Sequence, residues 1–426
     1  ALYAYDPEAA LRAAKASEAR WMKGEPLPLD GVPCTIKENI ATKGVPVPLG
    51  TGLGKQPTAS ADAPPAARLS EDRALVLAKT TCPDFGMLSS GLSSFHGITR
   101  NPWNLACNTG GSSSGAGAAA AAGFGPLHVG TDIGGSVRLP AAWCGIVGFK
   151  PTLGRIPIDP YYVGRCAGPM TRSVEDAALM MNTLARTDRR DAMRLPPEHI
   201  DWMDLALDVK GLRIGVMMEA GCGLPLDEEI RYHVEQAARL LEAAGATLVP
   251  MAPVLSREML DGLDHFWQAR QWSELSKLAA EEREQVLPAI LAWADGGARL
   301  SGVEVVQGFQ QTMAMRRATE SVFETVDVVI SPTTPNIAFP AEWASPTNDP
   351  RQPFEHIAYT VPWNMGEQPA ISLNAGLSKR NMPIGVQLIG PRFADHFVLK
   401  LARQLEARLG LPMCLPMPVC DKSVLE

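Results

Sequence analysis

Two patterns of hydrophobic and polar positions alternate along the chain. Apolar residues recur at helical spacing over residues 7–23, 172–184, 226–244 and 394–409. Short, mostly apolar runs that predict strands stand between them, at 31–40, 74–78, 126–132, 212–218, 246–251, 326–335, 369–376 and 384–390. Strands alternating with helices over the whole length predict an α/β fold, with a large mixed β-sheet covered on both faces by α-helices.

Two regions depart from this alternation. Residues 255–325 are helical in pattern nearly throughout, whereas residues 82–111 are rich in Ser, Gly, Asn and Pro and predict mostly loop. We find no internal repeat and no linker that would divide the chain, so we expect one domain.

The stretch "GGSSSGAG" at 110–117 places three hydroxyls at the start of a small-residue helix predicted over 114–123. A flexible linker is disfavoured, because small apolar residues follow at once. Nucleotide binding is disfavoured too, because the chain here lacks Gly-Lys-Ser/Thr and a dinucleotide fingerprint that follows a strand. Residues 111–115 also fit the G-x-S-x-G of a nucleophile elbow, but that motif needs a preceding strand, and we expect none at 100–109.

A second Gly-rich turn, "TDIGGSVR" at 131–138, lies between a predicted strand and a predicted helix and contains Ser136. The intervening helix and strand could return the chain to the first serines. The consecutive backbone N–H groups of Ile133, Gly134, Gly135 and Ser136 are candidates for an oxyanion hole.

Residues 110–140, "GGSSSGAGAAAAAGFGPLHVGTDIGGSVRLP", and their continuation "AAWCGIVGFKPTLGRIP" closely resemble the signature of the amidase signature hydrolases. Three more stretches are similar to motifs of that family: "DGVPCTIKENI", "AYTVPWNMGEQPAISLNAG" and "MPIGVQLIGPRFADHFVLKLARQLE". The resemblance spans roughly residues 30–175 and 325–410. It implies an amidase signature fold in a single domain, 1–426, with a signature core at 30–175. It also implies a variable, largely helical region at 185–325 that shapes the substrate pocket.

The resemblance implies a Ser–cis-Ser–Lys triad, with Ser136 as nucleophile, Ser112 as the bridging serine after a cis peptide bond, and Lys37 as base. Ser113 and Ser114 are then neighbours at the start of the helix. The family commonly has Gly where Ser114 stands, and Asp where Glu38 follows the lysine. Neither departure removes a member of the triad.

The chemistry explains these residue types. A serine must lose its proton as it attacks an amide carbonyl, and a lysine with an ordinary pKa near ~10.4 is charged and cannot accept that proton. Lys37 follows the apolar run "VPCTI", and burial there would favour its neutral form. Ser112 would relay the proton from Ser136 to Lys37 and later return it to the leaving amine.

Other residues near the motifs are assigned supporting or structural parts. We interpret Asp132 and Arg138 as a structural ion pair that braces the turn. Thr131, Ser113 and Ser114 are predicted supporting hydrogen-bond partners. Cys34 and Cys144 are predicted core thiols. For the substrate pocket we name Met87, Leu88 and Trp363, whose apolar side chains favour an aryl or acyl substrate over a charged one.

Composition narrows the function classes. The chain has 46% hydrophobic and 20% charged residues and a net charge of −7, which describes a globular protein without a basic groove for nucleic acid. No apolar run reaches the ~18 residues of a membrane span, and the eight cysteines and seven histidines show no metal-ligand spacing. We therefore expect no metal, no cofactor and no nucleic-acid or membrane partner. We expect a small-molecule amide substrate and a cytoplasmic location, and a homodimer stays open. The chain opens without Met, already in helical pattern, which predicts that residues precede it in the natural protein.

Three functions remain open at this point. The first is a stand-alone amidase that works through an acyl-Ser136 intermediate and that also accepts esters, anilides or carbamates. The second is the family's glutaminase branch, the A subunit of glutamyl-tRNA amidotransferase, which works with partner subunits. The third is a non-catalytic binding protein, which the intact triad disfavours.

Overall fold

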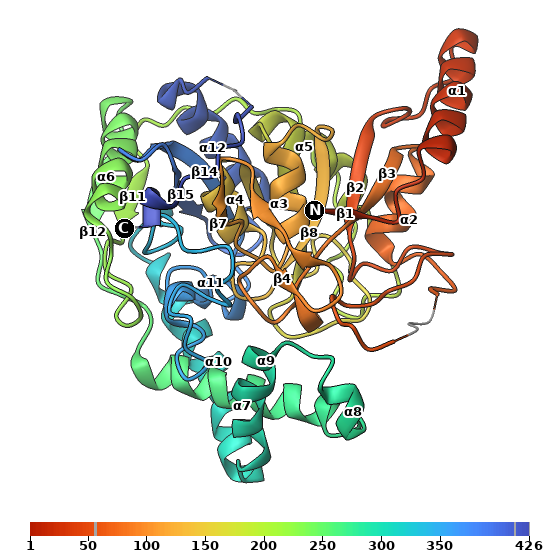
Figure 1. The fold of residues 1–426 in the computed structure, drawn as a ribbon. Coiled ribbons are helices and arrows are strands. Elements are labelled where there is room, and N and C mark those ends of the chain that lie inside the picture. Colours follow the sequence, from red (N-terminus) through yellow and green to blue (C-terminus); the bar gives the residue numbers. More distant parts are fainter. Residues whose placement is uncertain (55–57, 413–414, 426) are drawn as a thin grey trace.

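The chain is described by a computed structural model that covers residues 1–54, 58–412 and 415–425. An 11-stranded sheet runs through it in the order β1-β3-β2-β8-β10-β9-β14-β15-β13-β11-β12 (Figure 1). Its strands are Leu2–Tyr3 (β1), Pro33–Lys37 (β2), Leu75–Thr80 (β3), Leu127–Asp132 (β8), Val147–Lys150 (β9), Cys166–Thr171 (β10), Arg213–Val216 (β11), Thr247–Pro250 (β12), Val328–Pro332 (β13), Ala370–Leu377 (β14) and Pro383–Ile389 (β15).

The sheet is mixed, as predicted. Strands β3, β2 and β8 are parallel neighbours near one edge, and β13, β11 and β12 are parallel neighbours at the other. The central strands from β8 to β13 pair antiparallel. These central strands are buried on both faces, which explains why their sequences read as continuous apolar runs.

Helices cover both faces of the sheet. They are Pro7–Lys23 (α1), Pro64–Glu71 (α2), Ser114–Ala121 (α3), Arg138–Cys144 (α4), Val174–Leu184 (α5), Glu228–Ala243 (α6), Arg257–Leu275 (α7), Ala280–Arg283 (α8), Pro288–Ala294 (α9), Gly302–Val322 (α10), Pro362–Met365 (α11) and Asp395–Leu409 (α12). The largest core cluster joins the sheet to α2, α5, α6 and α12, and a smaller cluster joins it to α3 and α4.

Helix α3 packs unusually close to its surroundings because it has almost no side chains. All eight of its residues are buried. A Cβ added at Gly115 would lie 2.4 Å from the backbone nitrogen of Thr81, so only glycine fits there. This close approach brings the serines at the start of α3 down against the sheet.

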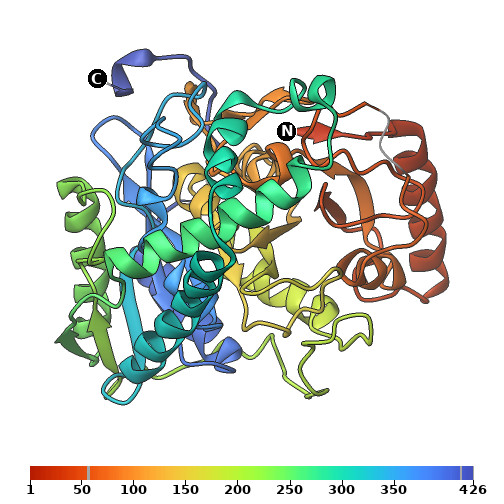
Figure 2. The same ribbon diagram turned by 90° about the horizontal axis from the view of Figure 1, so that it is seen from below.

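Helices α7 to α10 form a separate layer, the helical block, at residues 257–322. Figure 1 shows it below the sheet, and Figure 2 shows it from that side. A third core cluster joins α7 and α9 to α4, α11 and the segment around residue 357. The predicted helical region 185–325 therefore contains two kinds of structure, because β11, α6 and β12 belong to the main sheet and its cover.

The prediction of no strand at 100–109 is wrong. Arg100–Asn101 (β6) and Asn104–Asn108 (β7) form a two-stranded sheet, and Leu92–Ser93 (β4) pairs with Gly97–Ile98 (β5). The pattern hides these strands because they are short and their asparagines face inward: the side chains of Asn101 and Asn108 hydrogen-bond backbone groups. The hairpin of β6 and β7 lies outside the main sheet, so it does not supply the central strand of a nucleophile elbow.

Candidate active site

Lys37 and Ser112 are in direct contact. The Lys37 amine donates a hydrogen bond of 2.7 Å to Ser112 Oγ and one of 3.0 Å to Thr131 Oγ1. Both side chains are buried, and the Gly111–Ser112 peptide bond is cis, as predicted. Strand β2 runs parallel to β8, so Lys37 and Thr131, at the carboxyl ends of these strands, meet at one edge of the sheet.

Burial is the main cause that lowers the pKa of Lys37 to about 8. The charge of Arg165 acts in the same direction, and Cys82, Asp132 and Glu38 oppose the shift. Burial also lowers the pKa of Lys79, to about 7. Lys79, however, donates to the carbonyl of Ile40 and to Thr42 Oγ1 rather than to a serine. A depressed pKa therefore does not single out a base, and the contact with Ser112 is what distinguishes Lys37.

Ser136 sits on the turn between β8 and α4, next to the serines of α3. The N–H of Ser113 donates to the Ser136 carbonyl at 3.2 Å, so the two Gly-rich turns are adjacent, as predicted. Ser136 is 9% exposed and lines a small cavity. Within the described residues no hydrogen bond joins Ser136 Oγ to Ser112 Oγ. A proton relay through Ser112 needs contacts with both Lys37 and Ser136. Within the described residues, the structure contains the contact with Lys37 and lacks the one with Ser136 Oγ.

The backbone N–H groups of the turn are not equivalent. The N–H of Gly135 donates to Asp132 Oδ1 at 2.8 Å, so Gly135 is already satisfied and does not belong to an open oxyanion hole. Across residues 1–54, 58–412 and 415–425, no acceptor contacts the N–H groups of Ile133, Gly134 and Ser136. These three groups remain free to bind a developing negative charge.

Asp132 and Arg138 form the buried ion pair that the sequence predicts, with two contacts of 3.0 Å. Arg138 also donates to the Thr360 carbonyl at 3.1 Å, to Gln387 Oε1 at 2.7 Å and to Asn364 Oδ1 at 2.6 Å. Burial opposes the charge on Asp132, yet Arg138 and the hydrogen bonds from Arg138 and Asn364 hold the pKa of Asp132 well below its usual range. Every N–H of this guanidinium points to an acceptor that fixes the turn.

The remaining serines of the first turn hold the backbone. Ser113 Oγ donates to the Thr131 carbonyl at 3.1 Å, and Ser113 Oγ also accepts a hydrogen bond of 3.2 Å from the N–H of Thr131. Ser114 Oγ donates to the Thr81 carbonyl at 3.2 Å. Both serines therefore tie α3 to the sheet.

Glu38, which stands where the family has Asp, is fully buried behind Lys37. Its carboxylate contacts His96 Nε2 at 2.6 Å and accepts a 2.5 Å hydrogen bond from the N–H of Gly50. These contacts brace the loop that follows β2, and neither of them reaches Ser112 or Ser136.

The cavity beside Ser136 has mostly apolar walls. Met87 and Leu88 line it, as predicted. Trp363, which we also predict for the substrate pocket, does not line this cavity: its side chain is fully buried and packs near Phe323, with ring centroids 6.3 Å apart. The motif that contains Trp363 does not indicate that helix α11 directs this indole into the core.

Six wall residues were not singled out by the sequence: Gly86, Ser89, Trp267, Arg270, Phe354 and Ile357. Trp267 and Arg270 belong to α7, so the helical block contributes to the walls of this cavity. The sequence indicated the block as a whole, but no spacing within it shows which helix face meets a turn more than a hundred residues earlier.

The cavity at Ser136 is small in this structure, about 30 Å³. A neighbouring cavity of about 20 Å³ shares Met87, Leu88 and Phe354 with it.

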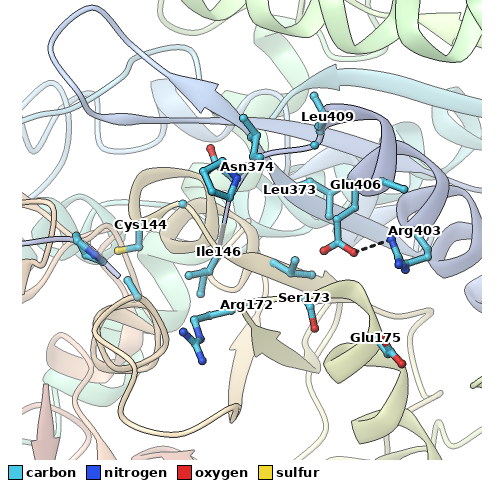
Figure 3. Close-up of a pocket in the computed structure, with 18 of the residues that line it drawn as sticks. Cys144, Ile146, Arg172, Ser173, Glu175, Leu373, Asn374, Arg403, Glu406 and Leu409 are labelled. Atoms are coloured by element: carbon cyan, nitrogen blue, oxygen red, sulfur yellow. Dashed lines mark ion pairs between the residues drawn. The ribbon is translucent and has the colours of Figure 1, made fainter. Parts of the chain in front are cut away.

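A larger cavity, about 390 Å³, lies elsewhere, between α12, β14 and the end of α4 (Figure 3). Cys144, Asn374 and the ion pair between Arg403 and Glu406 line it. None of the predicted catalytic residues lies in its walls. Its size alone does not make it the reaction site.

The two cysteines near the signature motifs, Cys34 and Cys144, are buried in the core. Burial raises the pKa of Cys34 to about 12 and also raises the pKa of Cys144, as expected for core thiols. Cys414 lies outside the described residues. Among the residues that the structure describes, no group of three His, Cys, Asp or Glu side chains could hold a metal ion. No helix in that part of the chain is long and apolar enough to cross a membrane.

Comparisons with known proteins agree with this geometry. The Amidase family model matches residues 1–399. In Halothermothrix orenii, the A subunit of glutamyl-tRNA(Gln) amidotransferase is 32% identical over 90% of this chain and 86% of its own. A bacterial aryl acylamidase structure superposes with a TM-score of 0.86 at 30% identity, covering 96% of this chain and 88% of its own. The structure of 6-aminohexanoate cyclic dimer hydrolase gives a TM-score of 0.85 at 26% identity, covering 96% and 89%. Together with the fold, these matches show that the chain belongs to the amidase signature family of amide hydrolases.

Proposed function

We propose that this protein hydrolyses carboxylic amides through an acyl-Ser136 intermediate, with Ser112 as proton relay and Lys37 as base. The observation that carries the proposal is the buried 2.7 Å contact between Lys37 Nζ and Ser112 Oγ. A lysine whose pKa is lowered to about 8 is substantially neutral near that pH and can accept a proton.

The steps follow from the positions of these groups. Ser136 Oγ attacks the amide carbonyl and gives its proton to Ser112, which passes its own to Lys37. The N–H groups of Ile133, Gly134 and Ser136 bind the oxyanion. The proton returns through Ser112 to the leaving amine, and water then hydrolyses the acyl-enzyme. Asp132 and Arg138 hold the turn and take no part in proton transfer.

The proposed substrates are linear amides and anilides. Esters and carbamates react through the same acyl-enzyme, so we extend the proposal to them. The apolar walls at Met87, Leu88 and Trp267 support an organic acyl or aryl group beside Ser136. No cofactor takes part in these steps. A cytoplasmic location and a homodimer are further predictions, which cell fractionation and light scattering would test.

The experiment is a panel of aliphatic amides, aryl anilides, carbamates and p-nitrophenyl esters with the wild type and Ser136→Ala. We expect Ser136→Ala to lower kcat by at least ~10³-fold on every substrate that the wild type cleaves. Mass spectrometry of the quenched wild type should find the acyl group on Ser136. If Ser136→Ala retained wild-type turnover, the proposal would fail.

A second candidate is the glutaminase component of a tRNA-dependent amidotransferase. It is favoured by the names of the curated relatives, among them a Chloroflexus aggregans protein that is 34% identical over 93% of this chain. Such a role predicts glutaminase activity and co-purification with partner subunits. Turnover of anilides by the isolated chain, with none of glutamine, would favour the stand-alone amidase.

A further inference from the structure

Arg270 is the one cation among the described residues that line the Ser136 cavity. The other lining residues are serines, glycines and apolar residues. Arg270 lies on the face of α7 that meets the nucleophile turn. Within the described part of the chain its guanidinium makes no ion pair and no hydrogen bond. A half-buried guanidinium with five donors that no described protein group engages is available to bind a ligand.

Tyr162 holds this guanidinium in place. The Arg270 guanidinium carbon lies 3.8 Å from the centroid of the Tyr162 ring, which is a cation–π contact. Phe266, one helical turn earlier on α7, stacks on the same ring with centroids 6.4 Å apart and an interplanar angle of 10°. The stacked Arg270 is therefore oriented by α7 and Tyr162 together.

The hydroxyl of Tyr162 is a second unused donor. Its oxygen is buried and has no hydrogen-bond partner in the part of the chain that the structure describes. A buried unpaired hydroxyl costs free energy, which an acceptor on a ligand would recover.

Arg165 adds a second positive charge behind the first. It donates to the carbonyls of Pro160 and Asn39 and makes no ion pair within the described ranges. Burial, with the charge of Arg270 as a smaller cause, lowers the pKa of Arg165 to about 10, and the charge of Asp159 opposes this shift. Neither arginine forms an ion pair within the described residues, although the charge of Asp159 acts on Arg165. An anion bound at Arg270 would reduce the repulsion between the two arginines.

We propose that Arg270, backed by Tyr162 and Arg165, binds a carboxylate on the substrate, so that the preferred amides carry an acidic group close to the scissile carbonyl. The inference rests on the proposed function, because it assigns a substrate class to the same site. It differs from the expectation of an aryl or acyl substrate over a charged one, which the apolar wall residues alone suggest.

Carboxylate fits this group better than a neutral polar group. A planar guanidinium offers two parallel donors that match the two oxygens of a carboxylate. Arg270 and Ser136 line the same small cavity, so a short linker between carboxylate and amide fits it.

The test compares N-(4-nitrophenyl)succinamate with N-(4-nitrophenyl)butyramide, which differ in the terminal carboxylate. We expect the wild type to prefer the succinamate in kcat/KM by roughly 10- to 100-fold, mostly through KM. Arg270→Gln should lower that ratio to about 1, and Arg270→Lys should keep part of it. Tyr162→Phe should raise KM for the succinamate several-fold and leave the butyramide unchanged. Arg283→Gln is the matched control, since Arg283 also lies over an aromatic ring, that of Trp272, but outside the cavity.

Calorimetric binding of the same two compounds to Ser136→Ala separates the inference from the proposed function. Stronger binding of the succinamate that Arg270→Gln abolishes supports the inference whether or not turnover is seen. Equal binding of both compounds, or a wild-type preference that Arg270→Gln leaves intact, overturns it. In the latter case turnover that still depends on Ser136 would leave the proposed function standing.

Discussion

The floor of the site and its outer wall are built on opposite principles. The floor consists of Lys37, Ser112, Thr131, Asp132 and Arg138, all buried, each polar group held by a partner within the signature core or the C-terminal strands. The outer wall consists of Trp267, Arg270, Phe354 and Ile357, which are mainly apolar and include a cation without an anionic partner among the described residues. A buried polar group tolerates only one arrangement of partners, whereas an apolar wall tolerates exchange. The reaction and the choice of substrate are therefore separable in this molecule.

The largest effect on the floor should come from Lys37→Met, which keeps the volume and removes the base. We expect kcat/KM to fall by up to ~10⁴-fold for all substrates alike, because the proton acceptor serves every acyl group. Steady-state kinetics on two unrelated anilides would measure it. A loss confined to one substrate would place Lys37 in selection rather than in chemistry.

Arg138→Met should damage the floor through stability. It leaves Asp132 buried without its cation and removes hydrogen bonds to Thr360 and Gln387. We expect the free energy of unfolding to fall by about 3–5 kcal/mol, measured by urea denaturation. Arg351→Met is the control: it breaks an ion pair with Asp349 at an arginine that is 87% exposed and should cost less than ~1 kcal/mol.

The pH dependence of the wild type tests the state of Lys37. Its neutral form is the active one and its pKa is about 8, so kcat/KM should rise about tenfold per pH unit below pH 8 and level off above it. The folded pKa lies below the unfolded value of 10.5, so the unfolded chain binds more protons between these values. Stability relative to Lys37→Met should therefore increase with pH from about 8 to 10.5. A flat activity profile would contradict the assignment of the base.

The smallest effect should come from the outer wall. A Cβ at Gly134 would lie 3.3 Å from Trp267 Cη2, so the indole closes the cavity against the turn. Trp267→Phe should open this space and shift the preference between a long and a short acyl anilide by about 10-fold, with little change in the kcat of the better one. Trp363→Phe, in the core, should shift it less than about twofold. Equal shifts in both variants would mean that the two tryptophans act through stability alone.

The same division explains what the sequence could predict. Helical spacing of apolar residues predicted most of the long helices. Short apolar runs predicted most of the main-sheet strands, because strands buried on both faces have nearly continuous apolar sequences. The motifs of the signature core predicted the Lys37–Ser112 contact and the Asp132–Arg138 pair. The hairpin of β6 and β7 was missed because inward-facing asparagines replace apolar residues there. Gly135 was placed among the free donors because the sequence does not reveal that the Asp132 carboxylate turns back onto its N–H.

The wall residues Trp267 and Arg270 could not be predicted for a different reason. Both side chains lie on one face of α7, and nothing in the spacing of that helix marks this face as the one that meets the nucleophile turn. The packing of the helical block against residues 354–357 determines which face of α7 meets the nucleophile turn. That packing is a long-range property that no local pattern encodes.

The guanidinium of Arg138 also sets an order of events during synthesis. Its partners Thr360, Asn364 and Gln387 are made more than two hundred residues later, and the last of them lies on β15, in the middle of the sheet. Strand β9 likewise waits for β14 to pair with. A ribosome-bound chain that ends before Gln387 thus carries all three triad residues without the bracing that fixes their turn. We therefore expect a chain truncated before Gln387 to lack amidase activity.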